Sequence, residues 1–159
     1  MTQRTLIPGY CIDTSAIIDL WRRHYPPDVF ESLWRDIEGL IGQGMLLAPQ
    51  EVFDEIASLD DELLKWAKQN KHMFESLDLS QISEVTTIER EFPNLVDPNK
   101  QTPDADPFIV ALAKTKCWAV ITSEKPGTEN RPKIPDVCRR KSVRCLSLIE
   151  FFREMNWKY

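Results

Sequence analysis

Acidic residues occur where short apolar segments give way to polar ones. Asp13 directly follows the apolar run "YCI", and Glu124 closes the segment "VITSE". Asp104 and Asp106 precede the apolar segment "PFIVALA". Several carboxylates within a few ångströms repel and raise one another's pKa, so such a group requires a cation or protons to balance it. Because carboxylate oxygens without His or Cys favour Mg²⁺ or Mn²⁺ over zinc, these acids are candidate ligands of such an ion.

Each of these acids also has a structural interpretation, because an Asp at the start of a helix satisfies a free backbone amide as an N-cap. Asp13 is in position to cap the helix that follows it. One of Asp104 and Asp106 is expected to cap the next apolar helix. Asp136, in "PDV", also resembles an ordinary cap and is therefore a weaker candidate ligand. Asp19 is expected to be a solvated surface acid.

Strand-like and helical patterns alternate along the chain. Short, almost continuous apolar runs predict strands, and apolar residues at helical spacing predict the helices between them. The predicted strands are 9–13, 45–49, 117–123 and 143–147. The predicted helices are 14–24, 28–42, 49–56, 60–70, 107–116 and 148–157, with a weaker helical pattern over 74–92, a proline-rich loop over 92–107 and a short helical turn near 137–141.

This alternation predicts a single α/β domain over residues 1–159, with helices on both faces of a mainly parallel sheet. In such a sheet the binding crevice lies beyond the carboxyl ends of the strands, where Asp13 and Glu124 are expected. Glu55 lies about one and a half turns into the helix after the second strand and is expected to point toward the same edge. Glu51 fits better as an acid that stabilises the N-terminus of that helix.

The composition is acidic overall, but the charge is unevenly distributed. The formal net charge is −5, yet nine basic and only three acidic residues lie between Lys114 and Arg144. A solvated basic face and a phosphate-binding surface both explain such a segment. The four cysteines lack CxxC spacing and are expected to be reduced and buried rather than to bind zinc. No run approaches the roughly 18 apolar residues that span a membrane, so we expect a soluble cytoplasmic protein without membrane association.

Three segments of the chain resemble motifs of the PIN-domain nucleases. "CIDTSAII" is similar to the first motif of that superfamily, which maps its first metal-binding acid to Asp13 and a supporting polar role to Ser15. "APQEVFDEI" resembles the helix that supplies the glutamate of the family, here Glu55. "DADPFIVALA" resembles the segment that supplies the third acid, here Asp106, with Asp104 as a neighbouring ligand or supporting group.

A fourth segment resembles the family but departs from its pattern. "AVITSE" is similar to a strand that commonly ends in Thr-x-Asp, whereas this chain offers Glu124, which is one methylene longer. The segment after it, "KPGTENRPKIPDVC", is unlike the compact toxins of the family and suggests a PIN-like subfamily in which Asp136 replaces or supplements a ligand. Thr122 and Ser123 either bind a carboxylate or a phosphate, or only end the strand.

The resemblance implies a Rossmann-like PIN fold and a nuclease that hydrolyses phosphodiester bonds, with RNA as the expected substrate. It implies that four acids hold Mg²⁺ or Mn²⁺ and orient the attacking water, namely Asp13, Glu55, Asp106 and Glu124. Many prokaryotic members are ribonuclease toxins, so the resemblance also implies an antitoxin protein as partner and a homodimer. The candidate substrate-binding residues are Ser15, Thr122, Ser123, Lys125, Arg131 and Lys133.

Other function classes explain parts of the same pattern. The main alternative is a PIN-like module that binds RNA or a protein without catalysis, and the departure at Glu124 is its best support. A phosphotransferase with an aspartyl nucleophile also begins with a strand that ends in Asp, but such enzymes resemble Asp-x-Asp and this chain has Ser15 at the second position. His24 and His72 are isolated from any Ser or Cys in a recognisable arrangement, so a nucleophilic triad is not supported.

Overall fold

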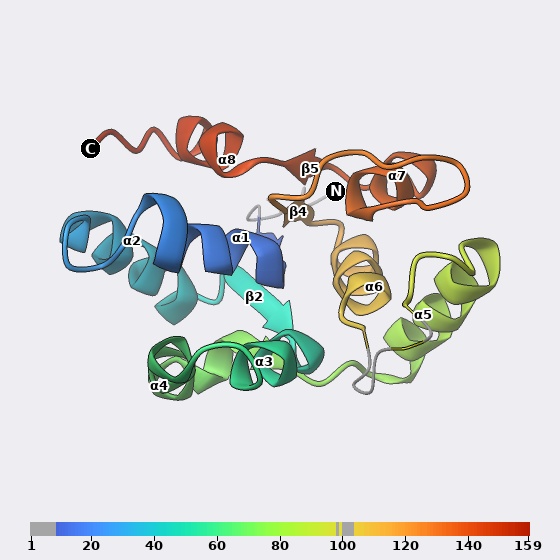
Figure 1. Cartoon of the computed structure of the whole chain (residues 1–159), viewed down its shortest axis with the longest axis horizontal. Helices are drawn as coiled ribbons and strands as arrows, with labels where there is room; N and C mark the ends of the chain where they lie inside the picture. Colours follow the sequence, from blue (N-terminus) through green and yellow to red (C-terminus); the bar gives the residue numbers. More distant parts are fainter. Residues whose placement is uncertain (1–8, 98, 100–103) are drawn as a thin grey trace, which may run out of the picture.

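The computed structural model describes residues 9–97, 99 and 104–159 and contains a five-stranded, all-parallel sheet (Figure 1). The strand order is β3-β2-β1-β4-β5, so the first strand lies at the centre and the chain winds outward from it in both directions. This is a Rossmann-like α/β fold, as the alternation of strands and helices predicts. The strands are β1 (Tyr10–Ile12), β2 (Leu46–Pro49), β3 (Phe74–Glu75), β4 (Ala119–Ile121) and β5 (Cys145–Leu146).

Helices connect the strands and cover both faces of the sheet. The α-helices are α1 (Thr14–Ile18), α2 (Glu31–Gly42), α3 (Gln50–Ala57), α4 (Asp61–Gln69), α5 (Leu79–Glu91), α6 (Asp106–Lys116), α7 (Ile134–Arg140) and α8 (Leu148–Glu154). Two other helical segments are the π-helix η1 (Asp19–His24) and the 3-10 helix η2 (Lys71–Met73). Among the residues with described placement, no helix is long and apolar enough to cross a membrane.

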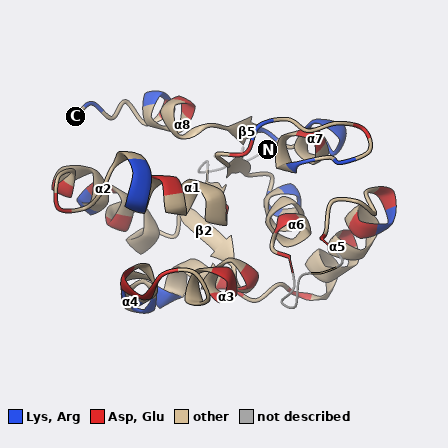
Figure 2. Ribbon diagram, in the orientation of Figure 1, with Lys and Arg blue, Asp and Glu red and all other residues tan. Residues whose placement is uncertain are grey.

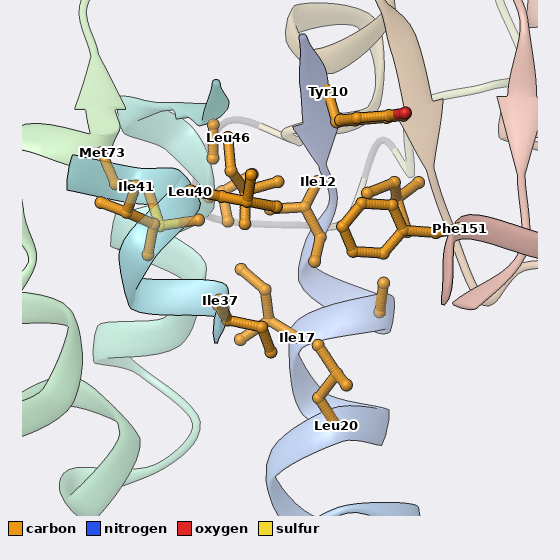
Figure 3. Close-up of a cluster of buried hydrophobic side chains, with 14 of the residues drawn as sticks. Tyr10, Ile12, Ile17, Leu20, Ile37, Leu40, Ile41, Leu46, Met73 and Phe151 are labelled. Carbon is orange, nitrogen blue, oxygen red and sulfur yellow. The ribbon is translucent and has the colours of Figure 1, made fainter. Parts of the chain in front are cut away.

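The alternation of side chains along the central strands divides the core into two layers. Tyr10 and Ile12 of β1 contribute to one cluster of buried residues, with α1, α2, α4 and α8, whereas Cys11 between them contributes to a second cluster, with α5, α6 and α7. In β4, Ala119 and Ile121 likewise belong to the first cluster and Val120 to the second. Figure 3 shows the first cluster gathered around β1. Side chains that alternate between two buried faces explain why these strands read as continuous apolar runs.

The structure differs from the sequence predictions in two elements. Phe74 and Glu75 form the edge strand β3, within a region where only a weak helical pattern was found. A strand of two residues is too short to produce a period-2 pattern in the sequence. This strand is therefore defined by its pairing with β2. The predicted helix 14–24 begins as an α-helix but continues as the π-helix η1, in which the Tyr25 amide donates to the Leu20 carbonyl at 3.2 Å.

The residue that precedes β1, Gly9, lies closely against the ring of Trp118. A Cβ atom added to Gly9 would lie 2.2 Å from the ring of Trp118, whereas one added to Gly39 in α2 would meet no atom within 4 Å. We therefore predict that Gly9→Ala lowers the free energy of unfolding by ~1–3 kcal/mol, because the ring must move. Gly39→Ala is the matched control and should stabilise the protein by ~0.5–1 kcal/mol through helix propensity. Urea unfolding measures both, and an equal effect of the two substitutions would contradict the proposed contact.

Candidate active site

Four of the predicted acids line one hollow beyond the carboxyl ends of the strands. It has a volume of about 310 Å³, and we call it the acidic hollow. Figure 2 shows acidic positions on α3 and α6 in this part of the molecule. The acids come from four separate segments of the chain, so the fold brings together what the sequence keeps apart. The lining residues are Asp13, Thr14, Ser15, Ile18, Asp19, Arg23, Glu55, Leu59, Asp106, Ser123 and Glu124.

Asp13 is both the cap that its position predicts and a member of the acidic hollow. Its Oδ1 accepts a hydrogen bond from the Ala16 amide at 2.9 Å, which caps α1. Its Oδ2 accepts one from Thr122 Oγ1 of the adjacent strand end at 2.7 Å. Burial raises the pKa of Asp13 to about 7, although the hydrogen bonds from Thr122, Ala16 and Ser15 lower it. The burial cost therefore exceeds the stabilisation of the carboxylate by these donors.

Ser15 and Thr122 connect the ends of β1 and β4 through their side chains. Ser15 Oγ donates to both oxygens of Asp13 at 2.9 Å and accepts from the Ser123 amide at 3.1 Å. Thr122 Oγ1 accepts from the Glu124 amide at 3.0 Å while it donates to Asp13. These contacts position Asp13 and Glu124. Ser15 and Thr122 therefore support the acids of the site through hydrogen bonds.

Asp106 has the most perturbed ionisation in the acidic hollow. Burial and then the charges of Glu124, Asp104, Asp13 and Glu55 raise its pKa to about 9. Its backbone amide donates to Asp104 Oδ1 at 3.0 Å, but the N-cap of α6 is Ala105, so neither acid is the N-cap that the sequence predicts. At neutral pH the proton on Asp106 relieves the repulsion that its neighbours would otherwise exert.

Glu55 joins three segments at the edge of the acidic hollow. Its Oε1 accepts from Thr14 Oγ1 at 3.3 Å and from the Ala105 amide at 3.2 Å. The carboxylate therefore connects α3 to the starts of α1 and α6. Glu51, one turn earlier on α3, does not line the hollow, which agrees with the choice of Glu55 as the candidate ligand.

Glu124 and Asp136 hold the long loop between β4 and α7. Glu124 Oε2 accepts from the Ile134 amide at 3.1 Å while the residue lines the acidic hollow. Asp136 lies outside the hollow, and its Oδ2 accepts from the amides of Gly127 at 2.7 Å and Lys133 at 2.8 Å. The structure therefore brings Glu124, but not Asp136, together with the other acids.

The predicted basic residues are spread around this loop rather than inside the acidic hollow. Lys125, Arg131 and Lys133 are exposed and do not line it. Other cations of the basic segment pair with acids, which removes much of its local positive charge. These pairs are Lys116 with Glu75, Arg139 with Asp136, Lys141 with Glu84 and Glu91, and Arg144 with Glu154.

The sequence interpretation missed two charged residues of the acidic hollow. Asp19, expected to be a solvated surface acid, lines it with only 17% of its side chain exposed, and Asp19 Oδ1 lies 3.3 Å from Arg23 Nη1. Arg23 is the basic residue in the lining. Both residues lie in η1, so their placement depends on a π-helix that the apolar pattern predicts only as ordinary helix.

The donor chemistry of the acidic hollow fits Mg²⁺ or Mn²⁺, since its acids supply oxygen ligands that repel one another without a cation. In the described part of the chain, however, no three Asp, Glu, His or Cys side chains already form a group that could hold a metal ion. Ion binding at these acids therefore requires side-chain rearrangement or additional oxygen ligands from a substrate.

The raised pKa values predict how stability depends on pH without divalent cations. The folded state keeps protons on Asp106 below pH 9 and on Asp13 below pH 7, whereas unfolded carboxyls bind protons only near pH 4. The contribution of these two groups to stability therefore increases as the pH falls from 9 to about 4.

We predict that Asp106→Asn raises the unfolding temperature at pH 8 and reduces the increase in stability between pH 8 and pH 5, because folding no longer requires proton uptake at this position. The expected difference is at least ~1 kcal/mol, which corresponds to about 2–4 °C in a domain of this size. Calorimetric unfolding of both proteins measures it, with the exposed Asp28→Asn as control. Parallel pH curves for wild type and Asp106→Asn would contradict the placement of Asp106 among the other acids.

Comparison with known proteins identifies one family. The profile of a family described as a domain of unknown function, DUF4411, matches residues 10–159, which is nearly the whole chain. No curated protein matches the sequence.

Proposed function

The chain belongs to the DUF4411 family, whose function is unknown, and from its acidic hollow we propose that it is an Mg²⁺- or Mn²⁺-dependent nuclease that acts on RNA. One observation carries this proposal: Asp13, Glu55, Asp106 and Glu124 come from four segments and line a single hollow at the carboxyl edge of a parallel sheet. Ligands in open α/β sheets bind at this edge.

The ionisation of the acids supports a cation as the natural occupant of the acidic hollow. Asp106 holds a proton at neutral pH because burial, and then the charges of its neighbours, raise its pKa. A divalent cation neutralises the same repulsion and competes with that proton, as metal binding at carboxylates generally does. Asp13, Glu55, Asp106 and Glu124 are the residues that would hold it, with Asp104 beside them.

A bound ion of this type polarises a phosphate oxygen and lowers the pKa of a water molecule. The other residues of the hollow orient the reactants. Arg23 places a guanidinium in the hollow, where it donates to phosphate oxygens. Ser15 and Thr122 keep Asp13 in place through the hydrogen bonds at 2.9 and 2.7 Å.

The resemblance of four segments to PIN-domain nucleases supports the same activity, and an all-parallel Rossmann-like sheet is compatible with that fold. In this proposal the protein is a toxin-like endoribonuclease in the cytoplasm, with RNA as substrate, an antitoxin protein as partner and a second copy of the chain as dimer partner. These assignments follow from the resemblance alone.

A second candidate function is a PIN-like module that binds RNA or protein without cleavage. Two observations favour it. Glu124 Oε2 accepts a hydrogen bond from the Ile134 amide, which commits part of this carboxylate to the loop. In the described residues no group of three or more Asp, Glu, His or Cys side chains is already arranged to hold an ion. Such a module predicts salt-sensitive binding of RNA without turnover that depends on metal.

Two glutamates on α3 provide a matched test of the nuclease proposal. Glu55 lines the acidic hollow and Glu51, one turn earlier, does not. We predict that Glu55→Gln lowers Mn²⁺-dependent cleavage of single-stranded RNA by at least ~100-fold, as for other losses around metal sites, whereas Glu51→Gln retains the activity. Cleavage is measured by gel electrophoresis, with the fold of each variant checked by circular dichroism. Undiminished cleavage by Glu55→Gln would refute the assignment, and RNA binding without any cleavage would favour the module.

Binding of the cation itself supplies an independent test. We predict that wild-type protein binds Mn²⁺ in calorimetric titration at pH 8 and that the affinity falls by pH 6, because protons compete for the raised-pKa carboxyls Asp106 and Asp13. Asp13→Asn should abolish binding while the circular dichroism spectrum is unchanged. The exposed Asp28→Asn serves as control. Equal Mn²⁺ binding by wild type and Asp13→Asn would place the ion elsewhere.

A further inference from the structure

A second hollow lies directly beside the acidic hollow. It has a volume of about 280 Å³ and shares three lining residues with the acidic hollow, namely Asp19, Ser123 and Glu124. Its remaining lining differs from that of the acidic hollow because it includes two rings, beside a cation and aliphatic side chains. These residues are His24, Tyr25, Thr122, Lys125, Ser147, Leu148 and Ile149.

Two segments separate the hollows by directing consecutive residues to different sides. In η1, Arg23 lines the acidic hollow and His24 lines the second hollow. In the loop after β4, Glu124 lines both and Lys125 lines only the second. π-Helices are rare and occur frequently at functional sites, and here one supplies lining residues to both hollows.

The second hollow has a firm aromatic and aliphatic wall. The Tyr25 ring is held by edge-on contacts with Phe30 at 5.2 Å and Phe152 at 5.3 Å, measured between ring centroids. The His24 ring lies 6.2 Å from that of Tyr25 and is exposed. Ile149 of α8 is 44% exposed and adds an accessible aliphatic surface beside these rings. Such a surface matches the apolar face of a planar heterocycle.

The polar groups of the second hollow match the remainder of a nucleotide. Lys125 supplies an exposed ammonium group close to the shared wall, where a phosphate that enters the acidic hollow would lie. Ser147 Oγ caps α8 by accepting from the Glu150 amide at 3.2 Å, and its hydroxyl hydrogen suits an acceptor on the polar edge of a base.

We propose that the second hollow binds the base of a nucleotide adjacent to the scissile phosphate, so that the substrate is single-stranded RNA. This inference rests on the proposed nuclease function for the position of the phosphate. A base in a duplex is stacked and paired and cannot enter a lateral hollow, whereas an unpaired base can turn into it and stack on rings. Tyr25, His24 and Ile149 are then specificity-determining residues, and Lys125 contacts the backbone.

The test measures binding of fluorescently labelled pentauridylate, in excess Mg²⁺, to Asp106→Asn protein so that cleavage does not interfere. Five further oligonucleotides each lack one base. One abasic position should weaken binding by ~5–100-fold, the range for a stacked base, and the other positions should have smaller effects. Equal effects at all five positions, or no binding of the intact oligonucleotide, would overturn the proposal.

Variants of the second hollow complete a double-mutant cycle. His24→Ala combined with Ile149→Ser should reduce the effect of the sensitive abasic position to less than ~2-fold. His72→Ala, the same change at the other histidine of the chain, should leave that effect intact. An unchanged base effect in the combined variant would also overturn the proposal.

Cleavage of the same oligonucleotides by wild-type protein separates this inference from the nuclease proposal. Cleavage that is insensitive to every base removal supports a nuclease and rejects the base site. Binding that depends on one base, without any cleavage, supports the base site and rejects the nuclease in favour of an RNA-binding module.

Discussion

The buried carboxylate of Asp13 is the constraint on which the rest of the site depends. A carboxylate removed from water is unfavourable unless hydrogen-bond donors or a proton compensate it. Asp13 is 3% exposed and receives hydrogen bonds from the helix that it caps and from Thr122 at the end of the neighbouring strand. These donors fix the directions in which α1 and the loop after β4 leave the sheet. Those two directions place η1 and Glu124 around the acidic hollow.

The acids of the site have structural as well as chemical roles. Glu55 connects α3 to the starts of α1 and α6, and Glu124 connects the loop after β4 to the start of α7. Asp104 accepts the amide of Asp106. The cap interpretation and the ligand interpretation of these residues are therefore compatible, since a carboxylate has two oxygens. One consequence is that loss of an acid affects both stability and binding, so a matched substitution elsewhere on the same element is needed to separate the two effects.

The two hollows suggest how one site could combine reactivity with selectivity. The acidic hollow contains the groups that repel an anion unless a cation is present, and the second hollow contains rings, aliphatic side chains and Lys125. In the proposed function, a substrate that spans both hollows would gain stacking energy on one side of the shared wall while its phosphate lay on the other. The wall is formed by Asp19, Ser123 and Glu124, so a shift of η1 or of the loop after β4 changes both hollows together.

Local patterns in the sequence were sufficient to predict most of the elements and most of the acids. Apolar runs predicted four of the five strands, and the rule that parallel sheets bind ligands at their carboxyl edge brought Asp13, Glu55, Asp106 and Glu124 to one place. Tertiary structure alone decided the edge strand β3, the π-helix η1 and the inclusion of Asp19 and Arg23 in the acidic hollow. Tertiary structure also placed Asp136 outside the acidic hollow. It brought the start of α8 beside the acidic hollow, and residues of α8 there line the second hollow. The physical reason is that hydrophobic periodicity records which side of an element is buried, whereas a two-residue strand, a widened helical turn and a shared wall depend on contacts between segments far apart in the chain.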